Sequence, residues 1–265
     1  RYRMQSFQKL TFTDWALTAR YFGAGRQAGL SIHNGYNNPS SWGYVIGVMD
    51  GVNARASFGT GIARAFGTKV TSRTLLADGH GVEEFHPEVF IHSSYKSQDM
   101  NIKSDTDEKG GSFRYSTSLS IAWDPDPVPF TDYTLKTAFD FLCKMYGLSF
   151  FTSFYLGFAE LNETDYSPAL AGYLLLSAYR LNQLFDISLR YAAVDYFGDL
   201  VQAVRQQSPG TNQNTRLLQE ITAGFNVYIV GHQVKWQHDA GLIFISQDER
   251  RNPDILIRSQ VLVSF

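Results

Sequence analysis

The sequence has a single cysteine, Cys143, and charged residues make up only 18% of its 265 positions. One cysteine excludes an internal disulfide framework and a cysteine-rich metal site. Basic and acidic residues nearly balance, at 23 against 25, which excludes an extended basic surface for nucleic acid. No apolar run approaches the roughly 20 residues that a transmembrane helix requires.

Aromatic residues are abundant, at 15% of the chain. In 112–123, large apolar side chains recur at nearly every second position, with Arg114 and serines between them, so the two kinds lie on opposite faces of a strand. Low charge, many aromatics and this alternation leave two classes, a soluble all-β protein and a membrane β-barrel. The alternation returns in 133–141, 148–156, 185–192, 221–229, 233–242 and 255–265.

The expected strands run to about 10–12 residues, longer than the mode in soluble sheets. That length suits a tilted strand crossing roughly 30 Å of hydrocarbon. Their polar face is rich in Ser, Thr, Gly, Asn and Gln, which fits a water-filled lumen better than bulk solvent. We therefore expect an all-β, transmembrane antiparallel β-barrel, with a large soluble β-sandwich or barrel as the alternative. The expected strands are 27–35, 42–52, 86–96, 112–123, 132–142, 148–158, 169–180, 185–195, 216–229, 233–244 and 255–265.

The connections between these strands differ in length. Tight turns at 143–147, 181–184 and 230–232 are expected on the periplasmic side, and the long loops 53–85, 196–215 and 245–254 outside. The connection 97–111 falls on the periplasmic side yet is long, so either this turn is long or a strand there is misassigned.

The chain ends in an aromatic residue, Phe265, preceded by apolar residues at alternate positions. This ending resembles the terminal-strand signature of bacterial outer-membrane proteins, in which a final aromatic residue is read by the assembly machinery. Phe265 is therefore a candidate assembly signal, and the bacterial outer membrane is the expected location.

Several short stretches, in order along the chain, together resemble one family: 2–6, 10–14, 26–30, 44–51, 146–150, 189–191 and 223–236. The chain looks like the C-terminal two-thirds of a porin of the phosphate-selective O and P family. The resemblance implies one barrel domain over 1–265, with sixteen strands of which the first five are absent from this sequence. It also implies a homotrimer and an inward-folded constriction loop at 1–25.

The candidate site residues are the charged groups that the alternation turns inward. Their mixed signs predict ion pairs that weaken a one-signed field, so a general pore is expected rather than a phosphate-selective one. The basic residues of 1–26 are expected to narrow the pore and attract anions. The pore-lining candidates are Arg114, Lys136, Asp140, Asp186, Arg190, Lys235, Asp239 and Arg258, and the constriction candidates are Arg3, Lys9, Arg20 and Arg26.

Other chemistry finds little support in the sequence. His33 has no matching serine motif for an outer-membrane hydrolase. His232 and His238 lack partners at metal-ligand spacing and are expected to be structural. The acidic turns at 105–108 and 124–127 lack the spacing of a calcium loop and are expected to be solvated. No catalytic residue, metal site or cofactor is predicted, and no function is assigned to Cys143.

The sequence thus predicts an outer-membrane porin that lets small hydrophilic solutes or ions diffuse passively, with anion preference left open. The partners expected are outer-membrane lipid and further copies of the chain. The alternative is a porin-like barrel that does not conduct and acts as a scaffold or anchor for other envelope proteins.

Overall fold

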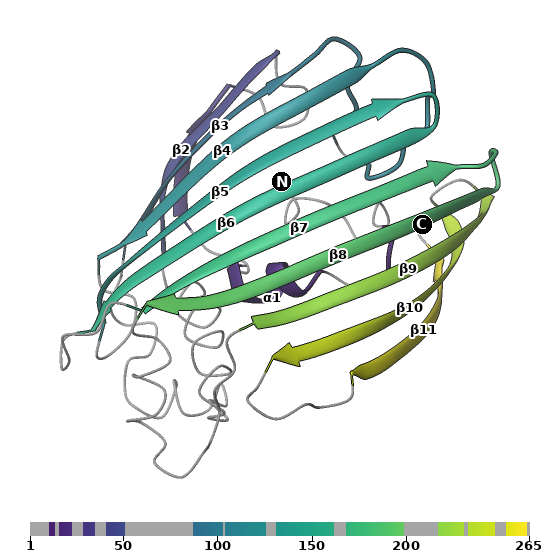
Figure 1. Ribbon diagram of the computed structural model, residues 1–265. Coiled ribbons are helices and arrows are strands. Elements are labelled where there is room, and N and C mark those ends of the chain that lie inside the picture. Colours follow the sequence, from purple (N-terminus) through teal and green to yellow (C-terminus); the bar gives the residue numbers. More distant parts are fainter. Residues whose placement is uncertain are drawn as a thin grey trace.

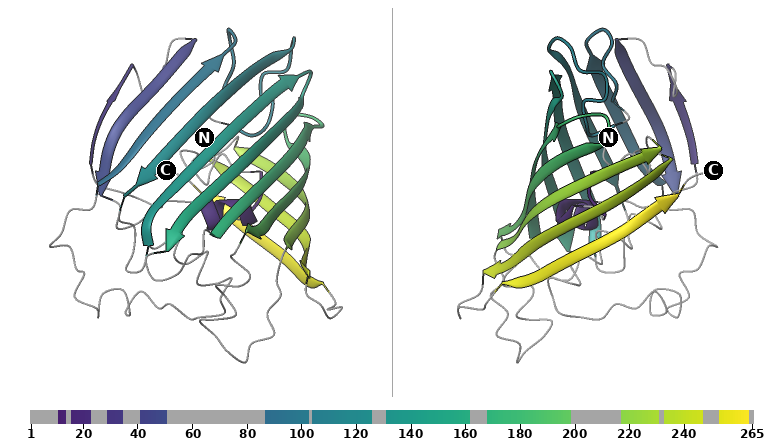
Figure 2. Two further views of the ribbon diagram at one scale, coloured as in Figure 1. Left: turned by 60° about the vertical axis from the view of Figure 1, so that its left-hand side comes forward. Right: turned by 90° about the vertical axis from the view of Figure 1, so that its right-hand side faces the viewer.

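The computed structural model describes residues 11–13, 16–22, 29–34, 41–50, 87–102, 104–125, 131–161, 168–198, 217–230, 233–246 and 253–263. These residues form eleven antiparallel strands in one sheet, each paired with its neighbours along the chain. The sheet curves strongly but is not closed (Figures 1 and 2). The described parts of β1 and β11 form its two edges. In this described part, α1 is the one helix, and no helix is long and apolar enough to cross a membrane.

All eleven strands that the alternation predicts are present, and they form one continuous antiparallel order. Most of them differ from the predicted bounds by only a few residues at either end. The strands are β1 (Gly29–His33), β2 (Trp42–Asp50), β3 (Pro87–Lys96), β4 (Arg114–Asp124), β5 (Thr131–Met145), β6 (Leu148–Leu161), β7 (Pro168–Arg180), β8 (Phe185–Gly198), β9 (Leu217–Val230), β10 (Val234–Ser246) and β11 (Asp254–Val263), and the helix α1 is Leu17–Phe22.

The two faces of the sheet differ sharply in chemistry. On the convex face every strand exposes large apolar side chains, because successive residues of a strand point to opposite sides. On the concave face the positions between them carry serines, threonines and most of the described charges. The exposed apolar residues include Leu30, Trp42, Ile91, Leu119, Phe139, Phe150, Leu175, Leu189, Ile221, Trp236 and Ile257.

At one end of the sheet lie the connection for which the sequence predicts a tight turn, 143–147, and the connection it left open, 97–111. The β5–β6 turn consists of Tyr146 and Gly147, both with positive φ (49° and 85°), as a two-residue hairpin turn of the mirror-image kind requires. The described residues 97–102 and 104–113 form one long connection between β3 and β4 and contain no strand. The long-turn alternative is therefore confirmed for this segment.

The turn between β5 and β6 gives a first prediction. Replacing Gly147 with alanine should destabilise the protein by about 1–2 kcal/mol, because a Cβ at positive φ is strained and meets the Arg180 carbonyl oxygen at 3.2 Å. Replacing Tyr146 with asparagine should be neutral or stabilising, because asparagine tolerates positive φ. Urea unfolding followed by circular dichroism measures both changes, and equal destabilisation by the two variants would contradict this turn geometry.

Candidate functional site

The described residues 11–13 and 16–22 form an inner strap that crosses the concave face of the sheet (Figure 2). At one end of the strap Thr13 is bound to β10, and the helix α1 packs against β8 and β7. At the other end the ring of Phe22 stacks on Tyr155 of β6, with ring centroids 5.1 Å apart. The strap therefore bridges the inner surfaces of β6 to β10.

Carboxylates of the sheet hold the backbone of the inner strap. The Thr13 backbone N–H and hydroxyl both donate to Asp239 Oδ2, at 2.8 and 2.6 Å. The Leu17 N–H donates to Glu220 Oε2 at 2.9 Å. Hydrogen bonds to ionised acceptors are stronger than bonds between neutral groups, so these contacts fix the strap at two heights on β9 and β10.

The same two carboxylates also bind arginines from neighbouring strands. Asp239 accepts a hydrogen bond from Arg258 Nε at 2.6 Å, and Glu220 pairs with Arg190, which is fully buried. The Arg190 guanidinium lies 4.4 Å from the centroid of the Phe12 ring. The strap thus covers Arg190 from above, with a favourable contact between a cation and an aromatic face.

Glycines of the sheet make room for the aromatic rings of the strap. A Cβ on Gly224 would lie 3.0 and 3.2 Å from two ring carbons of Phe12. On β7, a Cβ on Gly172 would collide with the ring of Phe22. Because strand glycines leave a gap where no side chain packs, each ring fills the place that the missing side chain leaves open.

An apolar core lies between the inner strap and the sheet. The sequence contains a signal for it, because the run 169–176 in β7 is apolar on both faces, as in a strand buried on both sides. This part of the concave face is packed and dry, although the alternation elsewhere led us to expect a polar inner face. The core consists of Phe12, Ala16, Leu17, Phe22, Met100, Leu142, Phe151, Leu170, Leu174, Leu176, Ala178, Ala192 and Val194.

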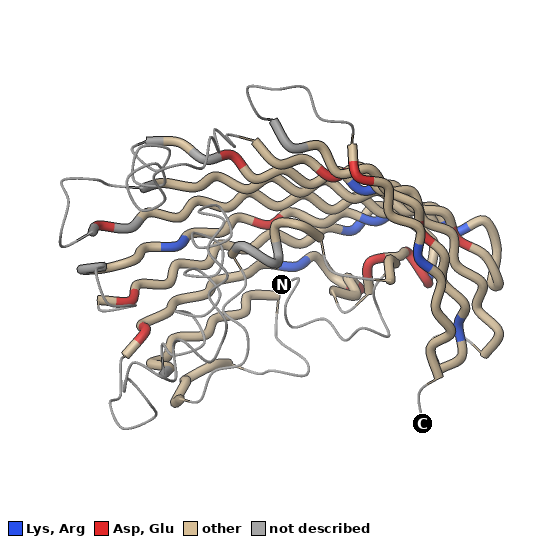
Figure 3. Tube along the Cα trace, turned by 90° about the horizontal axis from the view of Figure 1, so that it is seen from below, with Lys and Arg blue, Asp and Glu red and all other residues tan. Residues whose placement is uncertain are grey.

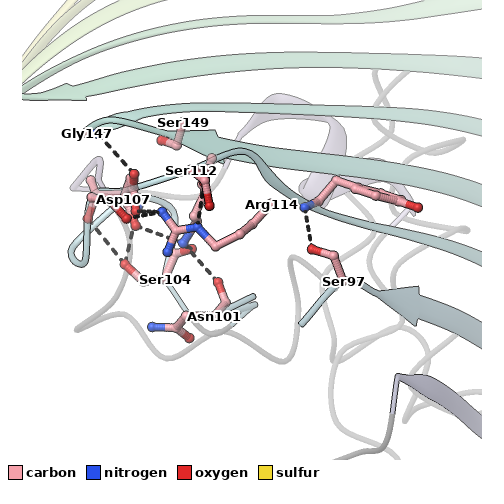
Figure 4. Close-up of polar contacts among 12 residues, drawn as sticks. Ser97, Asn101, Ser104, Asp107, Ser112, Arg114, Gly147 and Ser149 are labelled. Carbon is pink, nitrogen blue, oxygen red and sulfur yellow. Dashed lines mark hydrogen bonds and ion pairs between the residues drawn. The ribbon is translucent and has the colours of Figure 1, made fainter. Parts of the chain in front are cut away.

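The connection between β3 and β4 (97–102 and 104–113) forms an inner loop that folds onto the concave face. The buried ammonium of Lys144 in β5 donates to three of its carbonyl oxygens, those of Asn101 at 2.9 Å, Ser104 at 2.8 Å and Thr106 at 2.8 Å. Three donors on one ammonium match three acceptors that the loop would otherwise leave without a strand partner. Figure 4 shows Asn101, Ser104 and Asp107 of this loop close to Arg114 and Gly147.

The acidic turn at 105–108 is largely buried, so the expectation of a solvated turn is wrong. Asp107 is 2% exposed, and it pairs with Arg114 at 2.7 Å and accepts the Gly147 N–H at 3.0 Å. Asp105 is also buried and accepts the Thr11 N–H at 3.4 Å, which joins the inner loop to the strap. The cation, Arg114, is only seven residues from Asp107, but the N–H groups of Gly147 and Thr11 come from distant parts of the chain, which a local pattern does not reveal.

The eight pore-lining candidates all lie on strands at inward-facing positions, and blue and red positions sit close together on neighbouring strands in Figure 3. The predicted ion pairing is confirmed for Arg258 and Asp239. Arg190 pairs with Glu220 rather than with Asp186, and the alternation in β9 would have placed Glu220 on the inner face. That the eight line a pore stays a prediction. The remaining contacts are Arg114 with Asp107, Lys136 with Glu88, Asp140 with Ser118 and Ser153, Asp186 with Asn226 and Tyr228, and a fully buried position for Lys235.

Other candidates are placed only in part. Arg3, Lys9, Arg26, His232 and Phe265 lie outside the described residues, and Arg20 belongs to α1 with its side chain outside the description. His238 faces outward, with its ring 4.3 Å from that of Trp236, and His33 is exposed on β1. Across the described ranges, no group of three or more His, Cys, Asp or Glu residues is arranged to hold a metal ion.

The packing of the Phe12 ring against Gly224, its seat on β9, gives a second prediction. Replacing Gly224 with valine should displace the strap, because the new side chain occupies the place of the Phe12 ring. Trypsin cleavage after Arg20 in α1, followed by mass spectrometry, should then be at least five-fold faster than in the unchanged protein. Replacing Ala223 with valine is the matched control, because Ala223 lies on the same strand and faces outward. Equal cleavage of the two variants would contradict the proposed seat.

The ammonium of Lys144 gives a third prediction. Replacing Lys144 with methionine keeps the length of the side chain but leaves three carbonyls of the inner loop without their donor. We expect a loss of about 3 kcal/mol or more in the free energy of unfolding, measured in urea. Replacing the exposed Lys109 of the same loop with methionine should change stability by less than about 0.5 kcal/mol. Similar values for the two variants would rule out this role of Lys144.

The site therefore joins charged, hydrogen-bonded and apolar contacts on one concave surface. Comparisons with protein-family models, with curated proteins and with solved structures found no match for this chain.

Proposed function

We propose that the chain forms a β-barrel in the bacterial outer membrane and lets small hydrophilic solutes diffuse through it. The observation that carries this proposal is the two-faced sheet, apolar and exposed outside on all eleven strands, polar and charged inside. A soluble monomer rarely exposes apolar patches larger than a few hundred Å². A bilayer turns the same outer surface into a favourable contact.

The dimensions of the strands support a membrane location. The strands β4 to β10 have 11 to 15 residues. With a rise of about 3.4 Å per residue and a tilt of about 45°, 13 residues span roughly 30 Å, the thickness of the hydrocarbon core. Aromatic rings pack together near one end of the sheet, with 5.1 Å between Trp42 and Tyr95 and 5.9 Å between Tyr95 and Tyr115. Such belts are typical of the two interfaces of a membrane barrel.

A membrane barrel also has to satisfy the main-chain groups at its edges. The outer edges of β1 and β11 would leave N–H and C=O groups unpaired in hydrocarbon, where each unpaired group costs several kcal/mol. The described residues form an odd number of strands, eleven, whereas single-chain bacterial barrels have an even number. We propose that further strands pair with these edges, as the resemblance to sixteen-stranded, trimeric porins implies.

The interior favours a passive pore of limited width. The inner strap and the inner loop fill part of the concave face, so we expect the passage that remains in a closed barrel to be narrow. The described charges inside are mixed in sign, and most are paired, which suits general diffusion better than selection of one solute. Passage through such a pore requires no covalent chemistry and no cofactor.

The fourth prediction tests this function. The full-length protein should be reconstituted in a planar bilayer and its single-channel current recorded in potassium chloride under a salt gradient. We expect discrete steps of conductance, and steps in groups of three if the barrel is a trimer. The reversal potential reports whether anions or cations pass more readily.

A barrel that inserts correctly but does not conduct ions would contradict the porin proposal. Insertion is checked separately by protease protection after reconstitution of the protein into lipid vesicles. Silence together with stoichiometric copurification of another envelope protein would favour the alternative of a non-conducting scaffold, in which the packing around the inner strap extends across the whole interior.

A further inference from the structure

We infer that solutes pass along the inner face of β3 and β4 and that Lys96 on this face gives the passage a preference for small anions. This inference rests on the proposed porin function and specifies its pathway. It places the pathway away from Arg190 and Lys235, which are two of the eight pore-lining candidates. The inference depends on which inward-facing residues solvent reaches.

The wall formed by β6 to β9 is closed to solutes in this arrangement. Arg190, Thr222 and Asn226 are fully buried beneath the inner strap, although all three face inward. The Asn226 side chain donates to the Thr11 carbonyl of the strap at 2.8 Å, so the strap lies directly on this wall. A hydrated solute cannot contact these groups while the strap is in place.

The inner face of β3 stays partly exposed, whereas on β4 Ser120 is half-buried and Ser118 and Ser116 are buried, at 9% and 7% exposed. On β3 the consecutive inward positions are His92, Ser94 and Lys96, and none of them is buried. The register sets each of them opposite a serine of β4: Ser120, Ser118 and Ser116 respectively. We call these six residues the hydroxyl track. The contacts given for the inner strap lie on β6 to β10 and the inner loop, away from the track.

Hydroxyl groups suit the passage of hydrated solutes. A serine both donates and accepts a hydrogen bond, and its rotatable O–H adapts to either need. The His92 Nδ1 atom lies 2.8 Å from the Ser120 hydroxyl, so the ring and the hydroxyl form one polar unit. Such groups replace part of a hydration shell without holding the solute tightly, and conduction requires binding of that kind.

The charge on the track is positive. Two carboxylates lie near it, but Glu88 is buried beside Lys136 at 3.9 Å, and Asp140 is buried and accepts the Ser118 hydroxyl at 3.1 Å. Lys96 as a residue is partly exposed, and no ion pair to it is found within the described ranges. A partly exposed cation on a narrow wall attracts anions and repels cations.

The fifth prediction locates the pathway with introduced cysteines. In a background with Cys143→Ser, the variants Ser94→Cys and Ser120→Cys place a thiol on the track, and Ser188→Cys and Thr222→Cys place one beneath the strap. A negatively charged, membrane-impermeant methanethiosulfonate reagent is added to the protein in vesicles, and labelling is followed by mass spectrometry. Labelling on the track should be at least ten-fold faster than beneath the strap and should lower the single-channel conductance by half or more.

A variant of Lys96 tests the source of the ion preference. Lys96→Gln should lower the permeability ratio of chloride to potassium at least two-fold, and Lys96→Arg should keep it. Lys109→Gln is the matched control, because it removes the same charge from an exposed site on the inner loop. An unchanged ratio in Lys96→Gln would overturn the role of Lys96.

The two proposals fail in different ways. A conducting barrel whose thiols react faster beneath the strap than on the track would overturn the pathway and leave the porin function intact. A barrel that inserts but never conducts would overturn both, whatever the labelling rates are.

Discussion

The interior depends on two carboxylates that each bind a guanidinium and the backbone of the inner strap. Glu220 holds Arg190 and the Leu17 N–H, and Asp239 holds Arg258 and Thr13. A buried ion pair alone is seldom stabilising, because desolvation of both charges offsets their attraction. A further donor on each carboxylate tips this balance, and here the strap supplies it. We therefore expect the strap and the ion pairs to stabilise each other.

This mutual dependence explains why charged and apolar contacts lie side by side on one face. Once the strap is fixed over β8 and β9, its side chains Phe12 and Leu17 exclude water from the surface beneath. The inner loop adds a second cover, and its link from Asp105 to Thr11 connects the two covers. One part of the concave face is consequently packed like a protein core, while the inner face of β3 keeps part of its contact with solvent.

The strands could be predicted from the sequence because the signal for each is local. A two-residue period fixes the face of every side chain, so Leu119 and Trp123 are placed outward without reference to the rest of the chain. The cover on the inner face could not be predicted in this way, because Leu17 and Glu220 lie 203 positions apart. The apolar run in β7 was a local signal that this strand is buried on both faces, but it does not say what covers it. The alternation places Glu220 on the inner face, but it does not identify Arg190 or Leu17 as the partners of Glu220.

Ion preference in the proposed pore depends on which charged side chains have no ion-pair partner and contact solvent. The number of charged side chains that face inward matters less. An arginine bonded to a carboxylate acts on a passing ion as a dipole, whose field falls off faster with distance than that of a single charge. Arg190 is paired in this way and is also covered by Phe12, so its field is largely cancelled before it reaches the passage. Lys96 keeps the field of a whole charge within the roughly 8 Å over which physiological salt screens it. In a narrow passage that distance covers much of the cross-section. We therefore expect the partly exposed Lys96 to influence the ion preference more than several buried arginines do.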